Sequence, residues 1–408
     1  MLRTQMFRCS LPKDEADTLN RESGRAYTTT LVWHYRVYRQ THHWLSPQAG
    51  EQLGDYFDGP TLLHAHSRDG AQQGFPKACE TARACRLLGL DVRYPYKRKW
   101  YRTTIWKSTG IRLRDGRLWL ARARGLPPVV VVLPPNLAAL PQRAFHEVRL
   151  VWDQAARHHC WHLVVENYEA VPAPPGENVV GVDLGEIHPA VATDGGVGLV
   201  VSCRELRAAH QYTAKRMAEL RSLQDHKHKK SRRWKRLQRR KNRFLAQQKR
   251  RTRDMEHKVS RAVVEFAQER GAGTVVIGDT RDVADGKRLK TREQQKIGMW
   301  SHGKVRAYIT YKAEGAGIVV PEPLDEHYSS QTCPACGQRH KPRGRVYRCP
   351  SCGLVAHRDV VGAINILSRY RTGEVGQLAP PSIVKYRHPF LAGKRSRLDT
   401  AQVARGQP

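Results

Sequence analysis

Two Cys-x-x-Cys pairs constrain this chain more than any other part of its sequence. Cys333 and Cys336 are followed, after twelve residues, by Cys349 and Cys352, and each pair precedes a turn-forming glycine. Pairs at this separation form two knuckles whose four thiolates can close a tetrahedron around one Zn²⁺ ion. Two disulfides or four unrelated buried cysteines would leave the paired spacing unexplained, so we expect a structural zinc ribbon at about residues 329–356.

The rest of the cysteine pattern predicts a reducing compartment. The other five cysteines are scattered, and the odd total of nine argues against an oxidised, secreted framework. The first residues lack the apolar core of a signal peptide. No apolar run approaches the roughly 18 to 20 residues that span a bilayer, so we expect a cytoplasmic protein with no membrane partner.

The charge of the chain points to a polyanionic partner. The sequence has 71 Lys and Arg against 37 Asp and Glu, a formal net charge of +34, which favours nucleic acid. A helical region expected from Glu205 to about Gly271 holds the densest run of cations. The residues predicted to contact phosphates there are Lys229, Lys230, Arg232, Arg233, Lys235, Arg236, Arg239, Arg240, Lys241 and Arg243. A basic disordered or localisation segment is the alternative, but the spacing of Trp234, Leu237 and Phe244 favours a helix with a packed side.

The first part of the chain reads as short helices followed by a small sheet. We expect short helices from Ala49 to Leu90, then strands at Val92–Tyr96, Tyr101–Trp106 and further segments up to Leu133, in a twisted sheet or small barrel. A basic and aromatic cluster within this sheet is predicted to bind nucleic acid rather than to form a solvated face: Lys97, Arg98, Lys99, Trp100, Tyr101 and Arg102. The proline-rich stretch 171–177 is the predicted domain boundary.

Three acids follow or begin apolar elements in the second part of the chain. Asp183 ends the strand Val179–Asp183, Asp279 ends the strand Thr274–Asp279, and Asp359 begins a helix beyond the cysteines. Burying an unpaired carboxylate is costly, which favours ligand roles for these acids. Acids in such positions can hold two Mg²⁺ ions on either side of a scissile phosphate.

At these residues the sequence resembles a known family. The segments Gly181-Val-Asp-Leu-Gly185, Tyr328 to Cys333, and His357-Arg-Asp through Asn365 are similar to the RuvC-type nuclease half of the transposon-encoded TnpB proteins and of their descendants, the miniature type V CRISPR effectors. The likeness covers about residues 178–367. It implies an RNA-guided DNA endonuclease of the prokaryotic cytoplasm and nucleoid, whose guide RNA pairs with target double-stranded DNA beside a short flanking motif.

The resemblance also implies an architecture. Residues 178–408 would form an α/β, RNase H-like RuvC domain with the inserted zinc ribbon and a basic tail, partly disordered or in contact with RNA. Residues 1–177 would form a β-barrel wedge domain carrying a helical recognition insertion at about 40–90. A monomer or a homodimer would both suit so small a protein.

The catalytic acids carried over by resemblance are Asp183 and Asp359. The family usually has Glu-Asp at the end of the second strand, where this chain has Gly278 and Asp279. Either cleavage is lost, leaving a guided DNA-binding repressor, or another acid supplies the missing ligand. The segment 318–326 reads as the neighbouring strand, and strands lie about 4.8 Å apart, so Glu326 is the predicted replacement, with Asp325 and Asp279 as further candidates.

Overall fold

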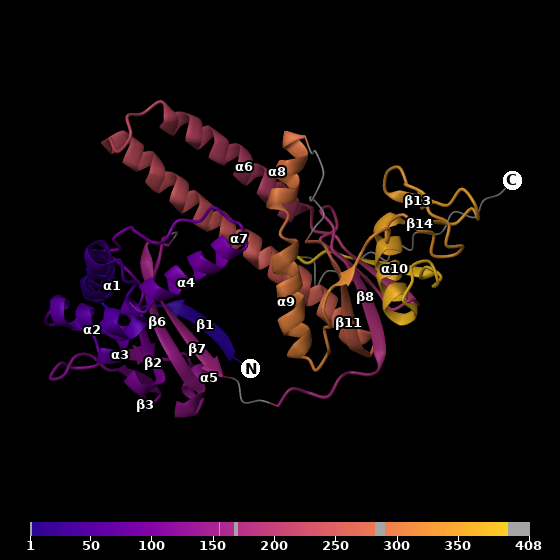
Figure 1. Ribbon diagram of the computed structural model, residues 1–408. Helices are drawn as coiled ribbons and strands as arrows, with labels where there is room; N and C mark the ends of the chain where they lie inside the picture. The colour runs from indigo at the N-terminus through magenta and orange to yellow at the C-terminus, as the bar shows by residue number, and fades with distance from the viewer. Residues whose placement is uncertain (1, 155, 167–169, 282–289, 391–408) are drawn as a thin grey trace. The chain divides into compact units, whose positions relative to one another are not determined.

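The chain folds as two compact units, Met1–Glu169 and Ala170–Pro408, shown in Figure 1. The computed structural model describes residues 2–154, 156–166, 170–281 and 290–390. Each unit has its own sheets and apolar core, so each is described by itself.

The first unit contains two antiparallel sheets. The larger has the order β1-β7-β6-β2 and the smaller the order β3-β4-β5. Their bounds are β1 Leu2–Arg8, β2 Thr104–Lys107, β3 Ile111–Arg114, β4 Arg117–Leu120, β5 Val129–Val132, β6 Phe145–Asp153 and β7 His158–Glu166. Inward side chains of both sheets share one core, in which the rings of Trp106 and Trp161 meet edge to face at 6.0 Å. The smaller elements are α5 Pro135–Ala138, η1 Ser108–Gly110 and η2 Gln142–Ala144.

Four helices complete the first unit. They are α1 Lys13–Thr41, α2 Pro47–Asp58, α3 Ala65–Gln72 and α4 Gly74–Leu87. The long α1 packs against β2, where the buried Asn20 side chain accepts a hydrogen bond from the Thr104 amide at 3.0 Å. The helices α2 to α4 occupy the region in which the sequence predicts short helices.

One predicted strand of this unit is wrong, and another begins later than expected. Val92–Tyr96 is irregular, and regular pairing begins at Thr104 rather than at Tyr101. The intervening backbone bonds to α1 instead of to a neighbouring strand: the Lys99 amide donates to Thr28 Oγ1 and the Arg102 amide to the Asn20 carbonyl. Donors used in this way cannot join a β ladder, so the predicted basic cluster lies on a loop rather than in a sheet.

The second unit is built on a mixed six-stranded sheet with the order β12-β11-β8-β9-β10-β15. The strand β9 is antiparallel to both of its neighbours, β8 and β10, whereas β11 and β12 run parallel to β8. The bounds are β8 Asn178–Asp183, β9 Ala190–Thr193, β10 Val197–Val201, β11 Ala272–Asp279, β12 Leu324–Asp325 and β15 Ile383–Arg387. Because β8, β11 and β12 are parallel, their carboxyl ends meet at one edge of the sheet.

Helices cover both faces of this sheet. They are α6 Arg204–Asp225, α7 Arg232–Glu269, α8 Thr291–Met299, α9 His302–Glu314 and α10 Arg358–Thr372. The end of α7 packs with α9 and the start of α6 on one face, through a core that includes Val263 and Ile309. The opposite face holds α10, through Val360 and Ala363 against Val191 and Val200. The predicted single helical region is thus a hairpin, because the chain turns between α6 and α7, where Lys230 has φ +70°.

The contact between α10 and the sheet depends on one glycine. A Cβ atom at Gly181 of β8 would lie 2.6 Å from the Ala363 carbonyl oxygen and 2.8 Å from Leu367 Cβ. Both distances are shorter than real Cβ contacts, so only glycine allows α10 to lie this close. The tail expected to be partly disordered or in contact with RNA is ordered at 383–387, because this segment forms β15 beside β10. Residues 391–408, which include the basic run at Lys394–Arg397, lie outside the described residues.

Candidate metal centres

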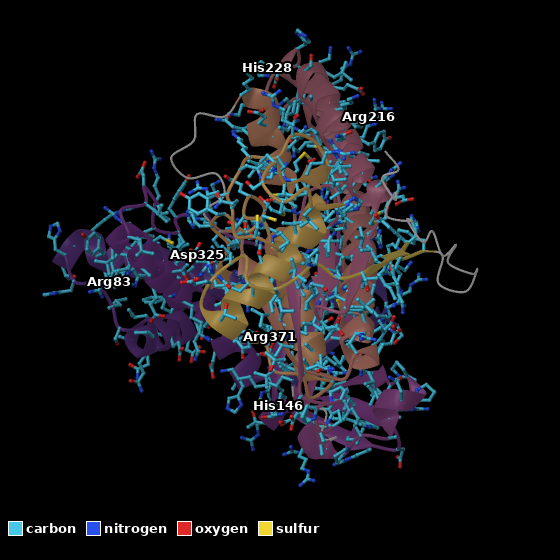
Figure 2. All side chains as sticks on the ribbon, turned by 90° about the vertical axis from the view of Figure 1, so that its right-hand side faces the viewer. Arg83, His146, Arg216, His228, Asp325 and Arg371 are labelled. Atoms are coloured by element: carbon cyan, nitrogen blue, oxygen red, sulfur yellow. The ribbon has the colours of Figure 1, made fainter. Side chains whose placement is uncertain are left out.

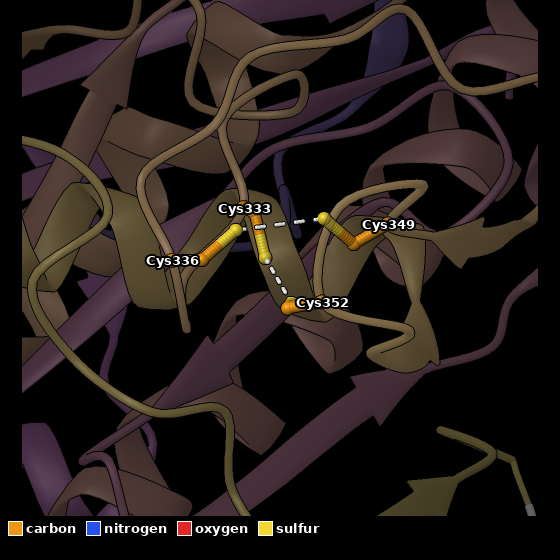
Figure 3. Close-up of side chains that lie close together, drawn as sticks. All are labelled: Cys333, Cys336, Cys349 and Cys352. Atoms are coloured by element: carbon orange, nitrogen blue, oxygen red, sulfur yellow. Dashed lines mark hydrogen bonds between the residues drawn. The ribbon is translucent and has the colours of Figure 1, made fainter.

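The four cysteines form one cluster with the geometry of a zinc site. Their sulfur atoms all lie within 4.8 Å of one another, and Cys333–Cys352 and Cys336–Cys349 each have Sγ atoms 3.6 Å apart (Figure 3). A disulfide would bring the sulfurs to about 2.05 Å. Four thiolates at 2.3 Å from a tetrahedral ion are about 3.8 Å apart, so the cluster fits Zn²⁺. The prediction of a four-cysteine zinc site is confirmed.

Each knuckle closes on a glycine in the left-handed region. Gly337 and Gly353 both have φ +72°, and their amides donate to the carbonyls of Cys333 and Cys349. A residue with a Cβ atom is strained at such angles, which explains the glycine after each pair. The strands β13 Val346–Arg348 and β14 Val355–His357 form a hairpin that carries the second knuckle toward α10.

The ribbon is attached to α10 at two points. Val361 of α10 packs with the buried Cys333, Cys349 and Tyr347. The buried Asn365 side chain donates to the carbonyls of Ser329 at 2.6 Å and Thr332 at 2.8 Å, where the ribbon begins. The cysteine cluster and α10, whose first turn contains Asp359, are therefore packed together.

The predicted catalytic acids line one cavity. A cavity of about 1250 Å³ at the carboxyl ends of the parallel strands is lined by Asp183, Asp279, Asp325, Glu326 and Asp359, among others. Asp183 ends β8, and Asp359 lies in the first turn of α10. Oxygen ligands gathered in this way suit Mg²⁺, which prefers carboxylates and water.

Asp183 and Asp359 influence each other electrostatically. Burial and then the charge of Asp359 raise the pKa of Asp183 to about 7, against an ordinary value of 3.8. Room for the Asp183 carboxylate depends on Gly362, where a Cβ atom would lie 2.7 Å from Asp183 Oδ2. Asp359 accepts from Arg345 Nη1 at 3.1 Å. A divalent cation would relieve the repulsion between these two acids.

Glu326 lies where the missing side chain of position 278 would begin. A Cβ atom at Gly278 would be 2.7 Å from Glu326 Oε2 and 3.4 Å from Glu326 Cβ. Gly278 pairs with Leu324 and Asp279 with Asp325, so Glu326 is the next residue beyond the paired segment. The predicted strand 318–326 is broken, with only Leu324–Asp325 in β12 and one bridge from Val319 to Thr274.

The two other candidate acids have arginine partners. Asp279 is bound by the Arg281 guanidinium and lies 3.7 Å from Arg306 Nη1. Asp325 Oδ2 accepts from Arg369 Nη1 at 2.9 Å, and its side chain is 61 % exposed. Among the candidate acids, Glu326 is the one whose side chain lies beside the Cβ position of residue 278.

Substitution of Asp183 by asparagine is expected to stabilise the fold at alkaline pH. The native carboxyl group keeps its proton up to about pH 7, whereas the unfolded one loses it near 3.8, so native stability falls as the pH rises from 3.8 to about 7 and stays low above that. Asparagine removes this charge and should raise the unfolding free energy by about 4 kcal/mol at pH 8 and by almost nothing at pH 4, since each tenfold change in protonation is worth about 1.4 kcal/mol.

Urea unfolding of Asp183→Asn at several pH values without added Mg²⁺ measures this gain. The matched control is Asp325→Asn, whose pKa is lowered, chiefly by its bond to His327, so its removal should bring no gain. An Asp183→Asn gain that does not depend on pH would contradict the assigned cause.

The predicted basic run is split between two sides of the α6–α7 hairpin. Most of its cations, including Arg232, Arg233 and Arg236, are exposed. Lys241 instead faces α6 and donates to Gln224 Oε1 at 2.6 Å. Figure 2 shows nitrogen-tipped side chains along the hairpin, from Arg216 on α6 to His228 at the turn. The exposed side of α7 therefore carries most of the predicted cations.

The predicted basic and aromatic cluster of the first unit is also divided, into exposed side chains and side chains that contact other parts of the unit. Lys97, Arg98 and Trp100 are exposed, and the Trp100 side chain is 59 % accessible. Tyr101 donates to Asp17 Oδ1 at 2.7 Å, while Arg102 and Lys99 lie over the ring of Tyr27 at 4.4 and 4.9 Å. Tyr101 and Arg102 thus make contacts inside the first unit.

Neutralising Arg232, Arg233 and Arg236 together with glutamine should weaken duplex DNA binding and flatten its salt dependence. The slope of log K against log salt concentration is negative, and each lost phosphate contact reduces its magnitude by about 0.9. Fluorescence anisotropy over a range of salt concentrations gives this slope. Lys241→Gln, from the hydrogen-bonded side of the same helix, is the control and should keep the wild-type slope. Equal slopes for the triple variant and the wild type would exclude this face as the contact surface.

Sequence reasoning did not assign three groups at or near the acidic cavity. Arg345, from the ribbon, binds Asp359. His188, from the loop after β8, and His357, the residue before α10, have ring centroids 5.2 Å apart. Gly185 allows the loop after β8 to adopt its conformation, because a Cβ atom at this position would lie 2.8 Å from the His188 carbonyl oxygen. His357 belongs to the quoted His-Arg-Asp motif, but nothing in the spacing indicates that His188 lies beside it.

Comparisons with known proteins agree with this arrangement. Residues 162–284 match the family model described as a probable transposase, and residues 302–366 match that of the Cas12f1-like TNB domain. A TnpB-like protein of Methanocaldococcus jannaschii is 27 % identical over 140 residues, 34 % of this chain and 49 % of the relative. The CRISPR-associated endodeoxyribonuclease Cas12f1 of Sulfoacidibacillus thermotolerans is 33 % identical over 113 residues, 27 % of this chain and 25 % of the relative.

The fold is also found in a solved structure. The Cas12f1–sgRNA–target DNA complex contains a chain with a TM-score of 0.58 and 14 % identity, covering 87 % of this chain and 82 % of that one. The protein thus has a mixed α/β, Cas12f-like fold with a four-cysteine zinc site. Its sequence is similar to the TnpB/Cas12f-like family, whose members are RuvC-type nucleases. The matches span about half of one curated relative and a quarter of the other. No helix within the described ranges is long and apolar enough to cross a membrane.

Proposed function

We propose that this protein is an RNA-guided, Mg²⁺-dependent DNA endonuclease. The observation that carries the proposal is the position of Glu326, whose Oε2 atom lies 2.7 Å from where a Cβ atom of residue 278 would be. The carboxylate that the family usually has on β11 is thereby supplied by the neighbouring segment. Together with Asp183 and Asp359, Glu326 completes a set of three acids from three elements on one cavity.

Each acid has a separate part in the proposed centre. Asp183, at the end of β8, and Asp359, in the first turn of α10, would hold Mg²⁺ together, because their charges already interact. Glu326 would contribute the third carboxylate from the segment after β12. Bound Mg²⁺ would supply an activated water and stabilise the leaving oxygen. Arg345 would have to release Asp359, and as a half-exposed side chain it can do so.

The proposed nucleic-acid contacts fall in both units. The exposed cations of α7 and the loop residues Lys97, Arg98 and Trp100 are placed to bind phosphates and stack on bases. The two sheets of the first unit would form the wedge domain, and α2 to α4 its recognition insertion. A guide RNA and a target double-stranded DNA are the proposed partners, with a homodimer as a possible assembly. The solved complex of the similar Cas12f1 chain with sgRNA and target DNA supports this choice.

A guided repressor without cleavage is the second candidate. It is favoured by the absence of an acid at Gly278 and by the arginine partners of Asp359 and Asp279. In this case the protein would still bind guide RNA and target DNA, but the acids would serve the fold rather than hold Mg²⁺.

Purification of the protein with its bound RNA, followed by sequencing of that RNA, identifies the guide. Incubation with matching DNA should then give Mg²⁺-dependent cleavage that is lost on chelation and in Asp183→Ala. Guide-dependent DNA binding with no cleavage in any divalent cation would establish the repressor instead. A protein that carries no specific RNA would exclude both functions.

A further inference from the structure

Beside the acidic cavity, three side chains form a second possible metal site. His188, His357 and Asp359 each offer one ligand atom, and these atoms all lie within 4.8 Å of one another. The four cysteines are the other such cluster found among the described residues. The three residues come from the loop after β8, the end of β14 and the first turn of α10. The fold therefore brings together groups that are 171 residues apart at the extremes.

Both imidazoles have a buried nitrogen that the fold does not use. The Nδ1 atoms of His188 and His357 are inaccessible to solvent, and neither finds a hydrogen-bond partner among the residues that the structure describes. A buried polar atom left without a hydrogen-bond partner destabilises the fold. Two such atoms on neighbouring rings, which meet edge to face, indicate that a further partner completes the site.

The charge around these rings is consistent with a cation. Asp359 is the nearby acid, and Asp183 lies next to it. Two cations oppose the binding of a metal ion. Arg345 binds Asp359 at 3.1 Å, and the positive charge of Arg204 interacts with His188. Arg345 lies on the ribbon and its side chain is 46 % exposed, so it can move into solvent when a metal ion takes its place.

We propose that His188, His357 and Asp359 bind a divalent first-row transition-metal ion, such as Zn²⁺ or Co²⁺. Two imidazoles and one carboxylate are a ligand set that suits these metals and leaves positions open for water. Mg²⁺ prefers oxygen ligands and is disfavoured at two imidazoles. Metal–nitrogen bonds of about 2.0 to 2.1 Å place tetrahedral ligands about 3.3 Å apart, so small side-chain rotations would close the site.

This site is separate from the proposed Mg²⁺ centre but shares Asp359 with it. The histidine side chains have no place in the two-ion scheme of Asp183, Glu326 and Asp359. A transition-metal ion held by the imidazoles would draw Asp359 toward the loop after β8. If the chain is a nuclease, micromolar Zn²⁺ or Co²⁺ would then compete with Mg²⁺ for this carboxylate. The binding itself does not depend on whether the chain cuts DNA.

The test is a Co²⁺ titration of full-length protein whose ribbon is already filled with Zn²⁺, without nucleic acid or Mg²⁺. Calorimetry gives stoichiometry and affinity, and visible absorption reports the ligands. We expect one Co²⁺ per chain, with ligand-field bands but without thiolate-to-cobalt charge-transfer bands, which would indicate entry into the ribbon. Removal of an outer-shell partner costs about 10- to 100-fold in metal affinity, so His188→Gln and His357→Gln should lose at least tenfold.

The matched control is His327→Gln. His327 lines the acidic cavity but lies outside the cluster, so this variant should bind Co²⁺ like the wild type. Arg345→Gln should bind more tightly, because it removes the competing cation. Circular dichroism of the metal-free variants checks that each is folded. No Co²⁺ beyond the ribbon, or equal affinity in the wild type and both cluster variants, would overturn the proposal. Loss of DNA cleavage alone would count only against the nuclease function.

Discussion

Replacing Glu326 by alanine is expected to lower the rate of Mg²⁺-dependent DNA cleavage at least about 100-fold while leaving DNA binding intact. Loss of an outer-shell partner of a metal site already lowers metal affinity or activity about 10- to 100-fold, and Glu326 is proposed to bind the ion directly. Its carboxylate fills the space beside Gly278 that a glutamate side chain on β11 would cross. The measurement is single-turnover cleavage with saturating guide RNA, paired with a binding assay on the same DNA.

The neighbouring acid provides the matched control. Asp325 precedes Glu326 and lines the same cavity, but it is bound to Arg369 and mostly exposed. Asp325→Ala should therefore keep cleavage within a few fold of the wild type. Full activity of Glu326→Ala would refute the relocated ligand.

A second change at position 278 sharpens this prediction. Gly278→Glu alone should impair the wild-type protein, because its Cβ atom would meet Glu326 Oε2. In the Glu326→Ala background this obstacle is gone, and the new carboxylate can reach the cavity from β11. Ile366 Cδ1 would still lie 2.8 Å from the new Cβ atom, so Ile366→Val should accompany the change. Recovery of cleavage in the combined variant, but not with Gly278→Gln, would show that one carboxylate can be supplied from either strand.

Cys333→Ser is expected to destroy the ribbon and to abolish cleavage together with it. Cys333 is fully buried, and zinc binding contributes about 10 to 16 kcal/mol to the folding of small zinc domains. Losing one of four thiolates should release the ion and loosen the contacts of Val361 and Asn365 that connect the ribbon to α10. Asp359 begins this helix, so its position should be lost as well.

Zinc content by metal analysis, thermal unfolding and cleavage rate are the three measurements. Cys85→Ser, a free cysteine of the first unit, is the control and should leave all three unchanged. A Cys333→Ser protein that retains full activity and an unchanged unfolding temperature would show that the ribbon does not hold the acids in place.

The parts that sequence predicted well are those with a local physical signature. The zinc cluster follows from cysteine spacing and from the glycines that close each knuckle. Asp183 and Asp279 could be placed because a run of β-branched residues ending in an acid is a buried strand whose carboxyl end reaches the edge of the sheet. The strand order then brought Glu326 beside Gly278.

The parts that it missed depend on contacts between distant segments. Nothing near Lys97–Arg102 shows that α1 would take its backbone donors, so a loop was read as a strand. The run at 383–387 has strand-forming residues, but its partner, β10, lies far away in the sequence. His188 and His357 come together only because Gly185 lets the loop after β8 turn back.

Because α10 packs closely on β8, one added carbon atom at their contact would change the distance between Asp183 and Asp359. Gly181 and Gly362 have no side chains at the contact between α10 and β8, the strand that carries Asp183. The methyl group of an alanine at either position would push the helix away from the strand and widen the gap between Asp183 and Asp359. Because a larger ion tolerates a wider gap, Gly362→Ala offers a way to shift the cation preference of the centre from Mg²⁺ toward Mn²⁺ or Ca²⁺ without altering any ligand.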